Sequence, residues 1–345
     1  MTDVSVLGAG SWGTALATLL CNKGKKVKIW ARSEATSQEI NTEHTNKKYL
    51  PGANLPLSLE CDTDLERVVS GSEVIVLSLP SHTVKDYLEQ IKPLLNESTV
   101  IVNTAKGFDV GTLQRLSQVA ATVLPGSENN FAMLSGPSHA EEVVKQMPTA
   151  VVSASKSKKT AEFVQDLFIC SSFRVYTNPD LVGVELGGAL KNVIALGTGI
   201  SDGLGFGDNT KAAFIARGIA EIGRLGVAMG GNPLTFAGLS GVGDLIVTCT
   251  SAHSRNRRAG ICIGSGKTLN QTLEEVGMVV EGVNATKAAY KLAQQYQVEM
   301  PIVEELYSIL FADQEASSAV RNLMERVKTN EMEDIGLAGD LWENN

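Results

Sequence analysis

The stretch Val4-Ser5-Val6-Leu7-Gly8-Ala9-Gly10-Ser11-Trp12-Gly13 decides the fold of the N-terminal half of the chain. A short β-branched run leads directly into glycines spaced as GxGxxG, and a segment with helical periodicity follows. In this arrangement Gly8 permits a tight turn, Gly10 lets a pyrophosphate approach the backbone, and Gly13 lets the helix pack closely on the strand. An isolated GxGxxG also occurs in purely structural turns, so its place between a strand and a helix is what predicts dinucleotide binding.

Outward from this turn, the chain alternates β-branched runs with helical periodicity up to about residue 178, which is typical of a parallel sheet covered by helices. The predicted strands are Val4–Leu7, Val27–Trp30, Val74–Leu79, Val100–Val102, Ala132–Leu134, Ala150–Ser153 and Arg174–Tyr176. The predicted helices between them are Gly13–Lys23, His82–Leu95, Thr112–Val123 and Lys158–Phe168. This half is therefore predicted to be α/β, a doubly wound sheet of Rossmann type.

A turn signal, Asn178-Pro179-Asp180, marks the end of the β-rich half, because only helical periodicity follows it. The predicted helices are Leu181–Thr198, Asn209–Met229, Val283–Tyr296, Val303–Phe311 and Ala316–Arg326. We therefore predict three regions: an NAD(P)-binding domain over residues 1–180, an all-helical substrate-binding domain over residues 181–330, and a polar tail over residues 331–345.

Composition and charge agree with an ordinary globular protein of two domains. The 345 residues exceed the usual span of one hydrophobic core, and 43% are hydrophobic and 20% charged. The formal net charge of −8, from 30 Lys and Arg against 38 Asp and Glu, repels polyanions, so nucleic acid is not an expected partner. Any anionic ligand must therefore be held by a local cluster of cations or backbone N–H groups.

The remaining compositional signals favour a cytoplasmic protein without metal. Five widely spaced cysteines lack a CxxC pattern, and the four histidines make no HExxH pattern, so reduced thiols and no metal site are expected. The longest apolar stretch, near Gly187–Gly205, contains Lys191, Asn192 and Asp202 and is not expected to span a membrane. The first strand is predicted to begin at Val4, so no signal peptide is expected.

Three strand ends in the first half carry candidate ligand contacts. At the end of the second strand, where an NAD-specific enzyme usually places a carboxylate, stands Arg32, which suits the 2′-phosphate of NADP. Glu34 lies close enough in the sequence that NAD remains an alternative cofactor. Arg32 could also be simply a solvated residue at the end of a strand. Lys106, Gly136 and Ser138 follow two further strands at the carboxyl edge, where open α/β sheets bind ligands. Each of these turns could equally be an ordinary strand-to-helix connection.

The helical half carries a candidate lysine and a candidate anion site. Lys191 has only small or apolar neighbours at helical spacing, which indicates a partly desolvated amine suited to proton transfer or a lysine that extends to solvent at a helix edge. Asp244 closes a GVGD segment, and Ser254-Arg255-Asn256-Arg257-Arg258 follows it. Ser254 could cap a helix whose N–H groups and Arg255 bind a phosphate, although a solvated basic face remains the alternative.

With these residues in view, the chain resembles bacterial-type NAD(P)-dependent glycerol-3-phosphate dehydrogenase. The likeness covers about residues 3 to 328 and rests on the ordered motifs GAGSWGTA, NTAKG, SGPSHAEE, GGALKNVIA, GVGDL, SRNRR and VVEG. It implies reversible reduction of glycerone phosphate to sn-glycerol 3-phosphate, which supplies glycerophospholipid synthesis. NADPH is favoured over NADH, and the sequence does not determine whether the chain forms a homodimer.

The resemblance also implies site residues. Lys191 would be the catalytic proton-transfer residue. Beside the turn glycines Gly8, Gly10 and Gly13, the cofactor would contact Ser11, Trp12, Arg32, Lys106, Ala140, Arg255, Val279 and Glu281. The substrate would contact Lys106, Gly136, Ser138, Lys191, Asp244, Ser254, Arg255 and Asn256.

Two other functions remain open at this point. Another two-domain dehydrogenase, for a hydroxy acid or hydroxyacyl thioester, would want a catalytic histidine with a carboxylate, and the second half offers only His253. A non-catalytic NADP-binding sensor would use the same Gly-rich turn but would not need Lys191, Asp244 and Arg255 together. Turnover of a phosphorylated substrate separates both from the first prediction.

Overall fold

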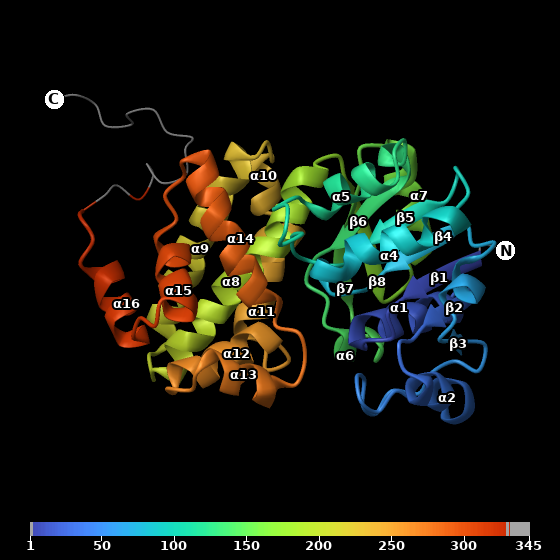
Figure 1. Cartoon of the computed structure of the whole chain (residues 1–345), viewed down its shortest axis with the longest axis horizontal. Coiled ribbons are helices and arrows are strands. Elements are labelled where there is room, and N and C mark those ends of the chain that lie inside the picture. The colour runs from blue at the N-terminus through green and yellow to red at the C-terminus, as the bar shows by residue number, and fades with distance from the viewer. Residues whose placement is uncertain (1–2, 329–330, 332–345) are drawn as a thin grey trace. The chain divides into compact units, whose positions relative to one another are not determined.

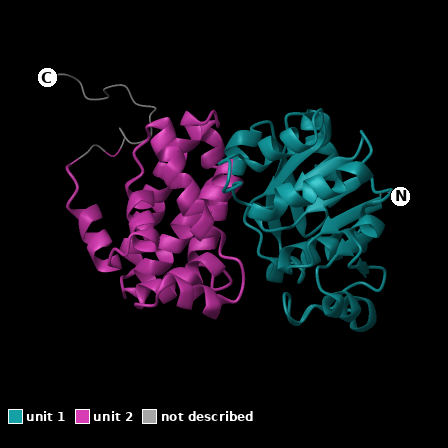
Figure 2. Ribbon diagram, in the orientation of Figure 1, with its two compact units in different colours: residues 1–185 teal, residues 186–345 magenta. Residues whose placement is uncertain are grey.

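The computed structural model describes residues 3–328 and residue 331, in two compact units, residues 1–185 and 186–345 (Figures 1 and 2). The predicted tail over residues 331–345 lies outside the described residues except for residue 331.

Unit 1 is built on one eight-stranded sheet with the order β3-β2-β1-β4-β5-β6-β7-β8 (Figure 1). The strands are β1 Asp3–Leu7, β2 Lys26–Trp30, β3 Glu60–Asp62, β4 Val74–Leu77, β5 Val100–Asn103, β6 Phe131–Ser135, β7 Thr149–Ala154 and β8 Phe173–Asn178. All pairings are parallel except β6 with β7. The order reverses at β1, with β2 on one side and β4 on the other, which is the switch point where doubly wound sheets bind ligands.

The helices of unit 1 cover this sheet in two layers. They are α1 Ser11–Asn22, α2 Glu34–Glu43, α3 Leu65–Val69, α4 Val84–Ile91, α5 Leu116–Val123, α6 Ala140–Val143 and α7 Lys158–Phe168. Helix α1 contacts α6 and α7, and α4 contacts α3 and α5. The crossover from β1 leads to β2, and the crossover from β4 leads to β5 in the opposite direction along the sheet. Because such crossovers are right-handed, their helices lie on opposite faces, so the sheet is buried from both sides. Strand β4 is accordingly an uninterrupted buried apolar run.

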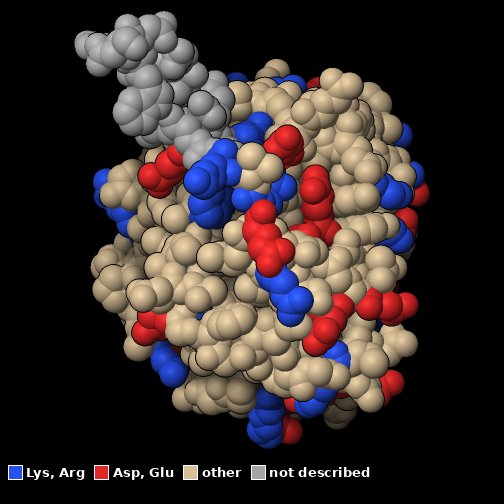
Figure 3. Space-filling view, turned by 90° about the vertical axis from the view of Figure 1, so that its left-hand side faces the viewer, with Lys and Arg blue, Asp and Glu red and all other residues tan. Residues whose placement is uncertain are grey.

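Unit 2 is helical throughout the part that the structure describes, which confirms the predicted fold class. Its helices are α8 Leu181–Gly203, whose first residues belong to unit 1, α9 Asp208–Ala228, α10 Pro233–Phe236, α11 Asp244–Thr250, α12 Arg255–Gly264, α13 Leu269–Val276, α14 Glu281–Tyr296, α15 Pro301–Phe311 and α16 Ala316–Met324. On the face in Figure 3, cationic and anionic side chains are interspersed.

Two stretches are long and apolar enough to cross a membrane by length and composition, Leu181–Gly203 and Pro233–Thr250. The apolar window of the first is 94% buried inside the protein, which is the burial of a core helix. The second is not one continuous helix, because Gly241 has non-helical backbone angles (φ −100°, ψ −106°) within it.

All seven predicted strands are present, and the differences are local. The short strand β3 and the antiparallel β6–β7 pairing were not predicted. The helix predicted over Thr112–Val123 begins only at Leu116, because Phe108 and Arg115 form an antiparallel bridge and Leu113 has a φ of 61°. The short helices α10 to α13 were absent from the predicted set, although a helix after Ser254 was anticipated.

Candidate functional site

The Gly-rich turn between β1 and α1 has the geometry that a bound pyrophosphate requires. Gly8 has a φ of +110°, and a Cβ on Gly13 would lie 2.0 Å from the Gly8 carbonyl oxygen, so neither position tolerates a side chain without strain. A Cβ on Gly10 would meet nothing within 4 Å, which leaves open space beside the backbone. Helix α1 starts at Ser11 with Gly10 as N-cap and no side-chain cap. An uncapped helix N-terminus next to open space fits a phosphate.

After strand β2 lie an exposed cation, Arg32, and a carboxylate that is hydrogen-bonded within unit 1, Glu34. Arg32 is exposed two residues after the end of β2. The Glu34 carboxylate accepts a hydrogen bond of 3.0 Å from the Thr63 hydroxyl, and the Trp30 indole donates to the Thr63 carbonyl at 2.9 Å. The Glu34 carboxylate, at the start of α2, therefore already has a partner in the loop after β3, whereas Arg32 extends at the surface.

Three predicted substrate contacts of unit 1 lie together at the carboxyl ends of β5 and β6. The Lys106 ammonium donates to the Gly136 carbonyl at 3.0 Å, and the Ser138 hydroxyl donates to the same oxygen at 2.9 Å. Gly136 has a φ of +139°, and a Cβ there would lie 2.9 Å from Val151 Cα. Glycine is therefore required at this turn, and it anchors Lys106 at the sheet edge. Ala140, a predicted cofactor contact, begins α6 close by in sequence.

Lys191 lies in the interior of unit 2 and forms an ion pair. Its side chain is 7% exposed and donates to Asp244 Oδ1 on α11, whose side chain is 1% exposed. The same ammonium donates to the Thr248 hydroxyl at 2.8 Å, one turn further along α11. The interpretation of Lys191 as a lysine that extends to solvent at a helix edge is therefore wrong, because its side chain is buried. The ion pair with Asp244 makes this burial possible, since buried charges persist only when they are paired.

The predicted anion site at the start of α12 is assembled around its N-cap. Ser254 accepts a hydrogen bond from the Arg257 backbone N–H at 3.2 Å, as predicted for a capping serine. Arg255 is exposed and donates to the Val279 carbonyl at 3.1 Å, which brings two predicted cofactor contacts together. Arg257 instead pairs with Asp202 at 2.6 Å. Asp202 of α8 therefore holds Arg257, whereas Arg255 contacts the segment before α14.

A buried amide chain links α8, α12 and α14. Asn256 Nδ2 donates to Asn192 Oδ1 at 2.8 Å, and the Gly282 N–H donates to Asn256 Oδ1 at 2.9 Å. Asn192, like Thr248, was missed by the sequence analysis, although it directly follows Lys191 in GGALKNVIA. Glycines allow the close approach of these helices: a Cβ on Gly199 would lie 2.1 Å from the Arg257 carbonyl oxygen.

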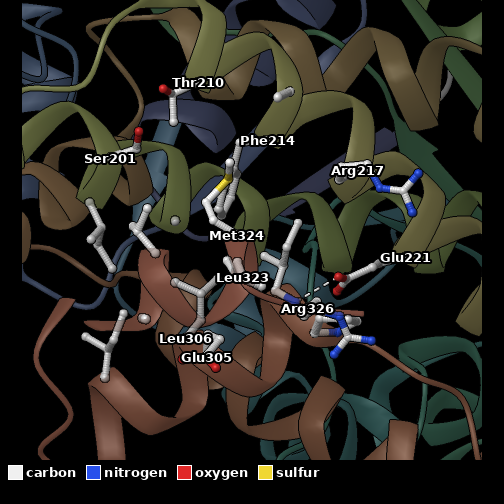
Figure 4. Close-up of a pocket in the computed structure, with 18 of the residues that line it drawn as sticks. Ser201, Thr210, Phe214, Arg217, Glu221, Glu305, Leu306, Leu323, Met324 and Arg326 are labelled. Atoms are coloured by element: carbon white, nitrogen blue, oxygen red, sulfur yellow. Dashed lines mark hydrogen bonds between the residues drawn. The ribbon is translucent and has the colours of Figure 1, made fainter. Parts of the chain in front are cut away.

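A separate cavity of 380 Å³ lies among α8, α9, α15 and α16 (Figure 4). None of the predicted site residues lines it. Glu221 faces this cavity, and its carboxylate accepts backbone hydrogen bonds from Ile302 and Val303 at the start of α15. Burial raises the pKa of Glu221 to about 7 in spite of these bonds. Within the described residues, no group of three or more His, Cys, Asp or Glu side chains could hold a metal ion.

A doubly wound sheet with an open Gly-rich turn, followed by a helical unit with a buried lysine–aspartate pair, defines the class of dinucleotide-dependent dehydrogenases. Two family descriptions match: NAD-dependent glycerol-3-phosphate dehydrogenase N-terminus over residues 3–161 and C-terminus over residues 180–321. The chain belongs to this NAD-dependent glycerol-3-phosphate dehydrogenase family, as the sequence motifs predicted.

Individual relatives agree with this assignment. The chain is 56% identical over 336 residues to glycerol-3-phosphate dehydrogenase [NAD(P)+] of Pelotomaculum thermopropionicum, covering 97% of this chain and 96% of that protein. It is 54% identical over 336 residues to the Bacillus subtilis protein of the same name, covering 97% of each. The crystal structure of glycerol-3-phosphate dehydrogenase from Coxiella burnetii is similar with a TM-score of 0.90 and 39% identity, covering 94% of this chain and 99% of that one.

Proposed function

We propose that this chain reduces glycerone phosphate reversibly to sn-glycerol 3-phosphate with NAD(P)H. The observation that carries the proposal is the buried Lys191–Asp244 pair in unit 2 of a chain whose unit 1 has an open dinucleotide turn. A binding module has no need of a buried ammonium with its own counter-ion, because such a pair costs desolvation free energy. A proton-transfer residue does need an amine held at one position.

The proposed chemistry divides between the cofactor and the side chains. Bound reduced nicotinamide supplies the hydride for the C2 carbonyl carbon of the substrate. Lys191 Nζ donates a proton to the oxygen of that carbonyl as it becomes an alkoxide, and in the reverse direction it accepts the proton. Asp244 and Thr248 hold the ammonium in place. Lys106 is a further proposed substrate contact, because its ammonium suits a developing negative charge.

The phosphate of the substrate is proposed to bind at the start of α12. Arg255 is exposed there, and the side chains of Ser254 and Asn256 are buried at the first turn. Charge-assisted hydrogen bonds from a guanidinium and from helix N–H groups suit a phosphate dianion. Binding this remote group would fix the orientation of the reacting carbon, which converts binding free energy into rate.

NADPH is the proposed favoured cofactor, since Arg32 is exposed at the end of β2 while Glu34 is hydrogen-bonded to Thr63. A free carboxylate at this place would favour the ribose hydroxyl of NAD.

The proposed location is the cytoplasm. All five cysteines are free, and burial raises the pKa of Cys21, Cys61 and Cys249 to about 11, so these thiols stay protonated and unreactive.

The test is oxidation of NADPH measured with glycerone phosphate and, in parallel, with unphosphorylated dihydroxyacetone. Rapid oxidation with the phosphorylated ketone and a kcat/KM at least a hundredfold lower with dihydroxyacetone is the expected result. NADPH binding without turnover of either ketone would favour the sensor, and turnover only with hydroxy or oxo acids would favour another dehydrogenase.

A further inference from the structure

The segment between α2 and β3 packs against the Gly-rich turn on its interior side, and Asn46 of this segment makes the hydrogen bonds to the turn. The Asn46 side chain is completely buried. Its Nδ2 donates to the Ala9 carbonyl at 3.0 Å and to the Thr14 hydroxyl at 2.9 Å. Ala9 lies within the GxGxxG turn, and Thr14 lies in the first turn of α1. One amide group thus contacts both sides of the turn.

The orientation of this amide is fixed by chemistry. A backbone carbonyl can only accept a hydrogen bond, so the atom of Asn46 that faces Ala9 must be the donor, Nδ2. Within the described part of the chain, the buried Oδ1 atom of Asn46 has no hydrogen-bond partner. A buried acceptor without a partner costs stability. The side chain therefore satisfies its neighbours at the expense of one of its own polar atoms.

The hydrogen bond to Ala9 has a consequence on the opposite side of the peptide plane. In a trans peptide the carbonyl of one residue and the N–H of the next point in opposite directions. When Asn46 holds the Ala9 oxygen toward the interior, the Gly10 N–H must point away from Asn46. Gly10 is also the residue beside which a Cβ would find only open space. Rotation of this peptide would instead present a carbonyl oxygen to an incoming phosphate, which repels it.

A second contact of the same segment supports this geometry. The Ser11 hydroxyl donates to the Tyr49 carbonyl, and the backbone N–H groups of Tyr49 and Leu50 donate to the Asn46 carbonyl at 3.2 and 2.8 Å. The segment is therefore internally hydrogen-bonded where it contacts the turn. Leu50 is buried and anchors it in the core of unit 1.

We propose that Asn46 is a positioning residue for the cofactor: its side-chain N–H groups hold the Ala9–Gly10 peptide in the orientation that directs the Gly10 N–H toward the dinucleotide pyrophosphate. Asn46 does not touch the cofactor. The inference rests on the dinucleotide binding of the proposed function and goes beyond it, because it assigns the preset shape of the turn to a residue 36 positions away from Gly10.

The test is Asn46→Leu, which preserves the approximate size of the side chain and removes both donors. The matched control is Asn41→Leu, because Asn41 lies in α2 of the same unit and donates to the Cys61 carbonyl at 2.7 Å while accepting from the Cys61 N–H at 2.8 Å. The readouts are the Kd for NADPH from fluorescence titration, the KM for each substrate, kcat and Tm.

We expect Asn46→Leu to raise the Kd and KM for NADPH at least tenfold, with kcat at saturating NADPH within threefold of wild type and the KM for glycerone phosphate unchanged. Asn41→Leu should lower Tm and leave the NADPH Kd within twofold. Thr14→Val removes one of the two acceptors and should raise the Kd about threefold, so it decides the matter if Asn46→Leu does not fold.

An NADPH Kd within twofold of wild type in the folded Asn46→Leu protein overturns the inference. So does an equal loss of affinity in Asn41→Leu, because the effect would then follow the general stability of unit 1. If Asn46→Leu does not fold, an unchanged Kd in Thr14→Val overturns it. Failure of the wild-type protein to bind NADPH or NADH would contradict the proposed function itself, which the same titration reveals.

Discussion

Lys191 on α8 and Asp244 on α11 form a buried ion pair, although 53 positions separate them in the sequence. Each charge is the counter-ion of the other in an interior where an unpaired charge is strongly disfavoured. A residue proposed for proton transfer is thereby also part of the stability of unit 2. Substitutions at this pair must therefore be designed so that lost chemistry and lost stability can be told apart.

Asp244→Asn is expected to destabilise the protein by about 3 to 5 kcal/mol, because it leaves the Lys191 ammonium buried without its carboxylate. Urea unfolding compared with wild type measures this loss. Lys191→Met should cause a loss of similar size for the converse reason. The double variant should be more stable than either single variant, since it contains no uncompensated charge. If the loss of unfolding free energy in the double variant equals the sum of the two single-variant losses, the pair is not coupled.

Arg255→Ala is expected to lower kcat/KM for glycerone phosphate by roughly 1.5 to 3 kcal/mol in transition-state free energy, the range for hydrogen bonds to charged groups. Dihydroxyacetone, which lacks the phosphate, should be affected much less. Arg258→Ala is the matched control, because Arg258 is an exposed cation of the same helix outside the proposed site. Equal losses with both ketones would assign Arg255 to the cofactor or the fold rather than to the phosphate.

Arg32→Asp is expected to shift the preference from NADPH toward NADH. The change removes a cation at the end of β2 and adds a carboxylate that can accept hydrogen bonds from a ribose. The ratio of kcat/KM for the two cofactors measures the shift, with Lys92→Asp as an exposed charge reversal elsewhere in unit 1. If the ratio does not change, Arg32 has no role in cofactor selection.

Glu221 is expected to make the stability of the protein depend on pH. Burial raises its pKa to about 7 from 4.5, so the folded state binds more protons than the unfolded state between these values. Its stabilising contribution is present at low pH and is lost as pH rises through about 7. The total change is of order 3 kcal/mol at 1.36 kcal/mol per pKa unit.

Urea unfolding of wild type and Glu221→Gln at about pH 5 and pH 8 isolates this contribution. The wild-type protein should lose more stability than the variant between the two pH values, because glutamine does not titrate. Parallel pH profiles for the two proteins would mean that Glu221 titrates near its ordinary value.

The sequence predicted the fold class and the site segments because both rest on local patterns. The Gly-rich turn, the β-branched runs and the capping role of Ser254 are all visible within a few residues. What the sequence could not predict depends on contacts across helices. Nothing near Lys191 indicates Asp244 as its partner, and nothing near Arg257 indicates that Asp202 neutralises it. The strand β3, with three residues, is too short for a period-of-two pattern to be recognised.

The central claim is that Lys191 supplies the proton for ketone reduction, and its most direct test is turnover by the Lys191→Met/Asp244→Asn double variant. This variant removes both members of the ion pair, so its fold and its NADPH affinity should remain close to wild type. We expect kcat with glycerone phosphate to fall by a factor of about 10² to 10⁴, the range for general acid catalysis. A folded double variant that binds NADPH and retains more than about a tenth of wild-type kcat would contradict the claim, because even the low end of that range exceeds such a loss.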